Sequence, residues 1–277
     1  MPRMIVDVHT HIFPPRMIAD RARLAATDAG FAALYAQPKA KMATAEELLA
    51  SMDAAGVDVA VACGFWWQHA EHAAEHRAEL LDAAARSGGR ILAFVPIAND
   101  EPTSVIDAAV EAGARGLGEL RAGATLDHAT TDLVRRAGER GLAVLAHCSE
   151  EVGHAYPGKA GGLTPGGLWR LVQAAPETRL IAAHWGGGFP FYGTMPEVRA
   201  HLDGGRVAFD TAAMPLLYEP RLFAAARALI GDGLVLWGSD FPLRDQRADR
   251  AGIEAALGDD AERAAVLGGS AARLLGL

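Results

Sequence analysis

The sequence predicts an α/β protein with the (β/α)8 barrel fold, in which eight parallel strands alternate with helices. Short apolar or β-branched runs recur along the whole chain, and each is followed by a segment rich in Ala, Leu, Glu and Arg. Eight such units, without a linker or a shift in composition, favour one closed sheet and a single domain over residues 1–277. A doubly wound open sheet is the alternative, but it rarely uses eight regular units.

The apolar runs give the predicted strands in order. They cover residues 4–11, 57–64, 90–98, 114–122, 142–149, 179–186, 206–213 and 234–241. The predicted helices follow them at residues 44–56, 70–88, 101–112, 127–140, 166–175, 195–204, 219–231 and 246–275, the last with a break at Gly258. Thr44 and Glu47 have the spacing of a capping box, which marks the start of the first helix.

Two connections are longer than usual in such a barrel. Residues 12–43 follow the first strand, and residues 150–165 follow the fifth. Both leave the carboxyl end of a strand, where barrels build their sites. We therefore expect lid loops after strands 1 and 5.

Charge and cysteine content exclude several classes of protein. The 26 basic and 34 acidic side chains give a formal net charge of −8, which argues against a nucleic-acid partner. Cys63 and Cys148 are too few for a disulfide framework or a thiolate zinc cluster. No apolar run reaches the ~18 residues of a membrane span and no signal-peptide pattern is visible, so we expect a cytoplasmic protein without a membrane partner.

The first strand ends in two histidines, His9 and His11. Side chains two residues apart on a strand point to the same side, here into the mouth of the barrel. Two neutral imidazoles placed in this way are a natural chelating pair for zinc or a similar divalent metal.

Further metal-capable side chains stand where other apolar strands give way to loops. They are Glu119 in the fourth strand, His147 in the fifth, His184 in the sixth and Asp240 in the eighth. Burying unpaired carboxylates costs several kcal/mol, so six such groups on one rim are hard to explain as core filling. A metal site removes that cost.

This pattern resembles the amidohydrolase superfamily, in particular the branch of barrel hydrolases and decarboxylases that includes the aminocarboxymuconate-semialdehyde decarboxylase-like proteins. The resemblance covers essentially the whole chain and is carried by Asp7-Val-His-Thr-His11, Ala183-His-Trp-Gly-Gly187 and Gly238-Ser-Asp-Phe-Pro242. It implies that His9, His11 and Asp240 bind one metal, with His147 on that metal or on a second. It also implies that Asp240 accepts a proton from the activated water.

The chain departs from one common pattern of the superfamily, in which a carboxylated lysine in the fourth strand bridges two metals. Its lysines all lie in predicted loops: Lys39, Lys41 and Lys159. Glu119 stands near the required position and is a candidate for the bridge. One ion would then be bound by His9, His11, Glu119 and Asp240, and another by Glu119, His147 and His184. The alternative role for Glu119 is an ion pair with Arg121 beside the metal.

Other side chains have weaker patterns. A donor-rich set is suited to a carboxylate or phosphate of the substrate, with ordinary loop polarity as the alternative: Arg121, His154, Tyr156, Lys159 and Arg244. The interspersed Ala and Glu residues predict a solvated helix face for His69, His72 and His76. Trp66 and Trp67 are candidates for a pocket wall or for core packing.

We expect a metal-dependent hydrolase that cleaves an ester, lactone or amide bond in a small anionic molecule, with Asp240 and His184 as catalytic residues. The expected cofactor is zinc, with manganese as the alternative, at one or two ions per chain. A decarboxylase of an unsaturated or aromatic carboxylic acid and a catalytically silent metal-binding barrel are the alternatives. Glu119 favours hydrolysis, because a second metal or a bridging hydroxide is more useful there. The expected partner is a small-molecule substrate, and a homo-oligomer is left open.

Overall fold

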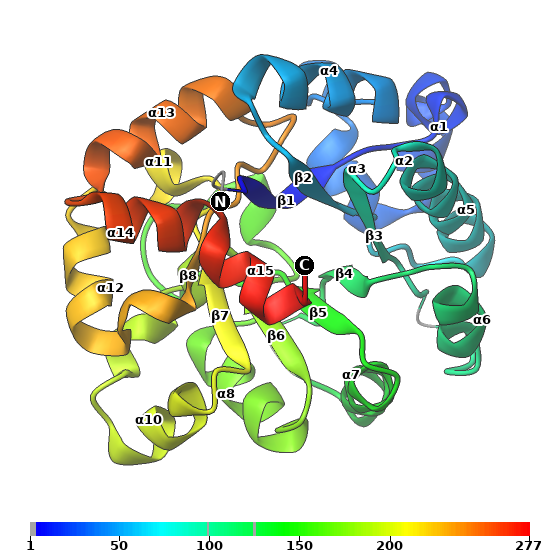
Figure 1. Ribbon diagram of the computed structural model, residues 1–277. Helices are drawn as coiled ribbons and strands as arrows, with labels where there is room; N and C mark the ends of the chain where they lie inside the picture. Colours follow the sequence, from blue (N-terminus) through cyan, green and yellow to red (C-terminus); the bar gives the residue numbers. More distant parts are fainter. Residues whose placement is uncertain (1–3, 99, 124–125) are drawn as a thin grey trace.

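The computed structural model describes residues 4–98, 100–123 and 126–277, and its eight parallel strands pair in chain order from β1 to β8 (Figure 1). The backbone N–H of Val8 donates to the carbonyl oxygen of Trp237 over 3.0 Å, and Thr10 bridges Phe241. These contacts bring the last strand back to the first. The predicted eight-stranded parallel barrel is therefore confirmed.

The strands are shorter than predicted but lie inside the predicted ranges. They are β1 (Val6–His11), β2 (Val59–Cys63), β3 (Ile91–Val95), β4 (Gly116–Leu120), β5 (Ala143–Ala146), β6 (Arg179–Ala182), β7 (Val207–Asp210) and β8 (Val235–Leu236).

Helices surround the sheet (Figure 1). The predicted ones are α4 (Ala45–Ala55), α5 (Ala70–Arg86), α6 (Val105–Glu111), α7 (His128–Glu139), α8 (Pro165–Ala174), α10 (Pro196–Asp203), α12 (Leu222–Ile230) and α13 (Gln246–Ala256). The last segment breaks at Gly258 as predicted and continues as α14 (Asp260–Ala264), the π-helical turn η4 (Ala265–Gly269) and α15 (Ser270–Leu275). The shorter segments are α9 (Ala183–Gly186), α11 (Met214–Leu217), η2 (Phe189–Tyr192) and η3 (Asp232–Leu234).

The capping box predicted from Thr44 and Glu47 forms at the start of α4. Thr44 Oγ1 accepts from the backbone N–H of Glu47, and Glu47 Oε2 accepts from the backbone N–H of Thr44.

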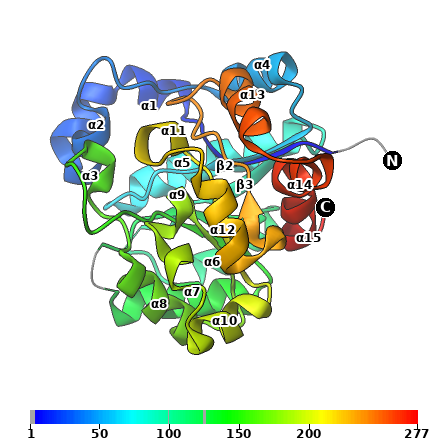
Figure 2. The same cartoon turned by 90° about the vertical axis from the view of Figure 1, so that its left-hand side faces the viewer.

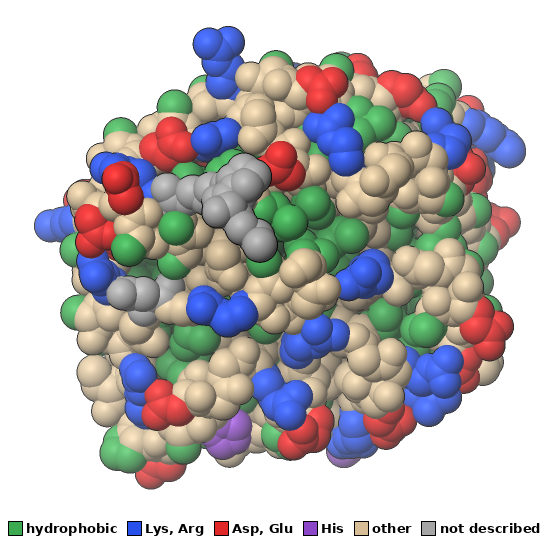
Figure 3. Space-filling model, in the orientation of Figure 1, with side chains coloured by type: hydrophobic (Ala, Val, Ile, Leu, Met, Phe, Trp, Pro, Cys, Tyr) green, Lys and Arg blue, Asp and Glu red, His purple; other side chains and the backbone are tan. Residues whose placement is uncertain are grey.

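Helix α15 closes the amino-terminal end of the barrel. It crosses the end at which both termini lie (Figure 1), and Ala271, Leu274 and Leu275 pack with the apolar cluster inside the barrel. Basic and acidic side chains are mixed over this face (Figure 3). None of the helices in the described ranges is long and apolar enough to cross a membrane.

The connection after β1 is helical and was wrongly expected to be a loop. It forms α1 (Pro15–Ala19), α2 (Arg21–Thr27) and α3 (Ala29–Tyr35). In Figure 2 these helices lie on the side of the molecule away from the termini. They bury a cluster of large apolar side chains, which explains why this long segment folds: Phe13, Met17, Leu24, Phe31, Phe65 and Trp67. The connection after β5 contains only the turn η1 (Pro157–Lys159), which contacts α3.

A solvated helix face was predicted for His69, His72 and His76, and this prediction is wrong for His72 and His76 on α5. His72 and His76 are 4% and 0% exposed, because α5 packs against the cluster that contains Trp67. Trp66 and Trp67 are buried as well, which favours core packing over a pocket wall. An Ala- and Glu-rich helix has a polar sequence, but its histidines face the protein.

Candidate metal centre

The two histidines of β1 meet inside the mouth of the barrel. The Nε2 atoms of His9 and His11 lie 3.1 Å apart, and both rings are buried. They project to the same side of the strand, as the spacing predicts. Both nitrogens face carboxylates from other strands.

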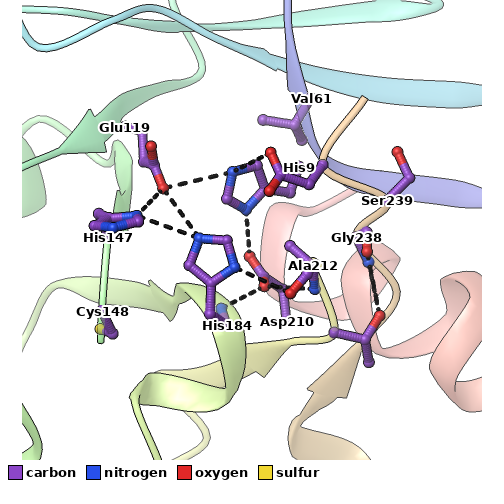
Figure 4. A network of polar contacts seen from close by, with 12 residues as sticks. His9, Val61, Glu119, His147, Cys148, His184, Asp210, Ala212, Gly238 and Ser239 are labelled. Atoms are coloured by element: carbon purple, nitrogen blue, oxygen red, sulfur yellow. Dashed lines mark hydrogen bonds and ion pairs between the residues drawn. The ribbon is translucent and has the colours of Figure 1, made fainter. Parts of the chain in front are cut away.

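Glu119 of β4 is joined by dashed lines to His9, His147 and His184 in Figure 4. Its Oε1 atom is 2.6 Å from His147 Nδ1, 3.5 Å from His9 Nε2 and 3.6 Å from His184 Nε2. Its Oε2 atom is 3.9 Å from His11 Nε2 and 3.4 Å from an amino group of Arg121. Burial raises the pKa of Glu119, but the contact with His147, the charge of Arg121 and the contact with His184 hold it well below its ordinary value. The carboxylate of Glu119 thus contacts both the candidate ligands and Arg121.

His147, directly after β5, is fixed by the connection that follows it. Its Nε2 atom donates to the carbonyl oxygen of Gly158 over 2.6 Å, which leaves Nδ1 facing Glu119. Burial and the charge of Arg121 lower the pKa of His147 to about 4. The side chain of the next residue, Cys148, belongs to the apolar cluster outside the barrel and lies away from the ligands (Figure 4).

Asp240 completes the set beside β1. Its Oδ1 atom is 3.6 Å from His11 Nε2 and 3.9 Å from His9 Nε2, and its side chain is 13% exposed. The residue lies beyond the two-residue strand β8, with a left-handed φ of 63°. Its backbone N–H donates to the carbonyl oxygen of His9, which holds the two ligand-bearing segments together.

Asp7 hydrogen-bonds to both of the segments that carry His9 and Asp240. Its carboxylate accepts from the hydroxyl of Ser239 over 2.6 Å and from Gln246 Nε2 over 2.8 Å, as well as from the backbone N–H of His9. Burial raises the pKa of Asp7 to about 6. The residue joins β1 to the segment that carries Asp240.

His184 lies at a different place from the one predicted. Strand β6 ends at Ala182, and His184 follows in a left-handed turn with a φ of 54°. The direction of this side chain is therefore set by the turn rather than by alternation along a strand. Its Nε2 atom is 3.2 Å from His147 Nδ1.

Asp210 of β7 was not among the predicted site residues. Its Oδ2 atom accepts from His9 Nδ1 over 2.8 Å, and its Oδ1 atom accepts from the backbone N–H of His184 over 2.8 Å. Both side chains are 0% exposed in the Asp210–His9 pair. Asp210 could have been found from the same pattern as Asp240, because each is an acidic residue at the end of an apolar strand.

The donor set fits a divalent cation. Ligand atoms at 2.0–2.2 Å from a tetrahedral ion lie about 3.3–3.6 Å apart, close to the separations among His9, His11, Glu119 and Asp240. Within the described ranges, two groups of side chains bring their ligand atoms within 4.8 Å of one another: His9, His11 and Asp240, and His9, Glu119 and His184. Burial lowers the pKa of His9, but the charges of Asp210, Glu119 and Asp240 outweigh it and raise the value to about 10. Surroundings that favour a proton so strongly also favour a metal cation.

The candidate substrate-binding residues lie in three places: beside the ligands, in the segment after β5, and near α13. Arg121 lies beside the ligands, with its side chain 14% exposed. Lys159 donates to the carbonyl oxygens of Val152 and His154, and Tyr156 donates to Glu150, so these residues also order the segment after β5. Arg244 donates to the buried carboxylate of Asp249 on α13.

Comparison with known proteins gives one family and a common fold. A family model described as "Amidohydrolase" matches residues 6–277. No curated protein matches the sequence.

Three solved structures illustrate the similarity in fold. A 5-carboxyvanillate decarboxylase from Novosphingobium aromaticivorans, complexed with manganese and 4-hydroxy-3-methoxy-5-nitrobenzoic acid, is 14% identical, with 100% of this chain and 97% of that chain covered and a TM-score of 0.73. A 2,6-dihydroxybenzoate decarboxylase from Rhizobium is 17% identical, with 99% of each chain covered and a TM-score of 0.72. A putative 2-pyrone-4,6-dicarboxylic acid hydrolase from Pseudomonas putida is 18% identical, with 100% and 98% covered and a TM-score of 0.68.

Proposed function

The chain belongs to the amidohydrolase family, and on that premise we propose that it is a divalent-metal-dependent hydrolase of an ester, lactone or amide bond in a small anionic molecule. The observation that carries the proposal is the convergence of His9, His11, Glu119 and Asp240 at ligand spacing in the mouth of the barrel. The partner is a small-molecule substrate, and we place the enzyme in the cytoplasm.

The proposed cofactor is zinc or manganese. Imidazole nitrogens suit zinc, whereas carboxylate oxygens also suit manganese, and the cluster offers both. Manganese is the ion in the solved 5-carboxyvanillate decarboxylase. When bound, the cation polarises the substrate oxygen under attack and lowers the pKa of water.

The side chains of this chain supply the remaining steps. Asp240 is partly exposed and lies beside His9 and His11, so its carboxylate is placed to accept a proton as water attacks. His184 is the second candidate for the proton carrier, a role open to its Nε2 atom when that atom does not bind the cation. Arg121 is the cation nearest the ligands and is suited to hold a substrate carboxylate.

Decarboxylation of an aromatic or unsaturated carboxylic acid is the second candidate. It is favoured by the two decarboxylases of similar fold, and Arg121 would hold a substrate carboxylate in that reaction too. The ligand set serves both reactions, and Glu119 at its centre favours hydrolysis.

Metal content and turnover measured on one preparation test the proposal. We expect metal in the purified protein and turnover of a carboxylated lactone, ester or amide, with one atom of ¹⁸O from labelled water in the product. Release of CO₂ with entry of a solvent deuteron at carbon would instead establish the decarboxylase. Bound metal without turnover of either substrate class would support the silent barrel, and a protein without affinity for zinc or manganese would refute all of these functions.

A further inference from the structure

Strand β7 supplies none of the candidate ligands, yet its end contacts two of them. We propose that the segment from Asp210 to Ala212 is a positioning element, which fixes His9 and His184 as the tautomers that turn an Nε2 lone pair to the cation. This inference rests on the proposed metal centre and assigns a task to residues outside its ligand set.

The first contact fixes His9. Asp210 Oδ2 is 2.8 Å from His9 Nδ1, and both side chains are fully buried. An ionised carboxylate only accepts hydrogen bonds, and two backbone N–H groups already donate to the other oxygen of Asp210. His9 Nδ1 therefore carries the proton. The Nε2 atom, which faces His11, Glu119 and Asp240, is the one that binds a cation.

The second contact fixes His184. Its Nδ1 atom is 3.0 Å from the carbonyl oxygen of Ala212. A carbonyl oxygen is an acceptor only, so Nδ1 donates and the Nε2 lone pair faces Glu119 and His147.

A third group of contacts joins the two histidines to one carboxylate. Asp210 Oδ1 accepts from the backbone N–H of His184 over 2.8 Å and from the backbone N–H of Ala212 over 3.0 Å (Figure 4). Donors thus approach both oxygens of Asp210, and the residue is 0% exposed. An asparagine has one acceptor oxygen and one amino group that donates. It can therefore accept either from His9 Nδ1 or from the two backbone N–H groups, but not from both. Either its amide faces His9 Nδ1 and forces the proton to Nε2, or its amide opposes two backbone N–H groups.

The variant Asp210→Asn tests this inference through metal affinity. We expect the dissociation constant for Zn²⁺ or Mn²⁺, measured by titrating metal-free protein in chelator-buffered solution, to rise ~10- to 100-fold, the usual effect of removing a partner of a metal-bound histidine. Asp249→Asn is the matched control. Asp249 is also buried and accepts from Trp237 Nε1 and Arg244, but it contacts none of the candidate ligands, so its loss should leave metal affinity unchanged.

The tautomers themselves give a second measurement, which a merely structural role would not predict. Long-range ¹H–¹⁵N NMR spectra distinguish protonated from bare ring nitrogens. We expect Nδ1 of His9 and of His184 to carry a proton in both the metal-free and the zinc-loaded wild type, and Nε2 to be without a proton when zinc is bound. In Asp210→Asn we expect a bare Nδ1 on His9 or loss of metal affinity.

A wild-type His9 that holds its proton on Nε2 alone would overturn the inference even if the variant failed to fold. Wild-type metal affinity in a folded Asp210→Asn would overturn it as well. Failure of the wild type to bind either ion would refute the proposed function, and the tautomer of metal-free His9 would still decide the role of Asp210.

Discussion

Glu119 is the carboxylate to which three imidazole rings of the cluster turn. Its Oε1 atom lies within 3.6 Å of nitrogens from β1, the end of β5 and the turn after β6. Its pKa stays well below the ordinary value in this buried position, where the charge of Arg121 lies 3.4 Å away. A neutral amide in its place would remove a negative charge from the proposed cation.

We therefore expect Glu119→Gln to weaken metal binding. If Glu119 bridges two ions, the variant loses at least one equivalent, because the carboxylate faces His11 on one side and His147 and His184 on the other. If it only supports the ligands, the metal count is unchanged and affinity falls ~10- to 100-fold. Metal content by mass spectrometry and a competition titration separate these results. Glu101→Gln, at a partly buried glutamate that pairs with Arg77, is the control, and equal metal binding in both variants would contradict a role for Glu119.

Asp240 joins two tasks in one side chain, since it faces both His11 and the open mouth. Asp240→Asn keeps the size and one acceptor oxygen but removes the proton acceptor. We expect partial metal retention and a loss of ~10² to 10⁴ in kcat, the range for a positioned general base. Asp245→Asn, at the cap of α13, should keep both kcat and metal. Near wild-type turnover in Asp240→Asn would transfer the role of proton acceptor to His184.

Helix α5 and the glycine turn after β6 hold the site in place without supplying ligands. His76 of α5 donates from Nε2 to the carbonyl oxygen of Ile12, the residue after His11, over 2.7 Å. Its Nδ1 atom accepts from Trp67 Nε1 and from the backbone of Phe65. This pattern requires a neutral ring, and burial lowers the pKa of His76 to about 4.

The stability of the fold should therefore depend on pH through His76. Between pH 6.5 and about 4 the unfolded chain binds a proton at this residue and the folded chain does not, so the free energy of unfolding falls as pH is lowered through that window. The contribution is up to about 3 kcal/mol. Urea unfolding between pH 7 and 4 should show a shallower pH dependence in His76→Gln than in the wild type. The exposed-residue control His128→Gln should keep the wild-type slope, and an unchanged slope in His76→Gln would contradict the prediction.

The turn at Gly187 requires glycine for two reasons. Its φ is 62°, and an added Cβ atom would lie 2.4 Å from the carbonyl oxygen of Ser149. Gly205 has a similar φ of 66° but open space around it. We expect Gly187→Ala to lower the free energy of unfolding by about 1–3 kcal/mol more than Gly205→Ala, because only the first adds a backbone clash to the strain of the left-handed conformation. Thermal or urea unfolding of the two variants measures the difference, and equal losses would contradict it.

The barrel brings together ligands that are distant in the chain. His9 and Asp240 are separated by most of the sequence, yet their segments pair where β8 returns to β1. A cation held by both would bind the folded chain and not the unfolded one. Metal binding should therefore stabilise the whole molecule.

We expect a chelator to lower the melting temperature of the purified protein. An ion present at 100 times its dissociation constant contributes about 2.7 kcal/mol to the free energy of unfolding. The double variant His9→Ala and His11→Ala should remain folded, because the barrel core is built from apolar layers below the mouth, and its melting temperature should not respond to the chelator. Calorimetry with and without added zinc or manganese checks both results. A wild-type melting temperature insensitive to both chelator and metal would contradict the proposed centre.

The barrel and the side chains that meet at its rim could be predicted from the amino-acid sequence. The alternation of apolar runs and helical segments is local information, and the carboxyl ends of parallel strands share one edge, so His9, His11, Glu119 and His147 follow from their positions. The tertiary structure alone decided the rest. His184 and Asp240 take left-handed backbones beyond their strands, and Asp210 contacts a partner 201 positions away. Trp67 packs against both His72 and His76, and Phe13 stacks on His76. Periodicity encodes which element forms, but burial and ring orientation depend on what packs against it, and those partners are far away in the chain.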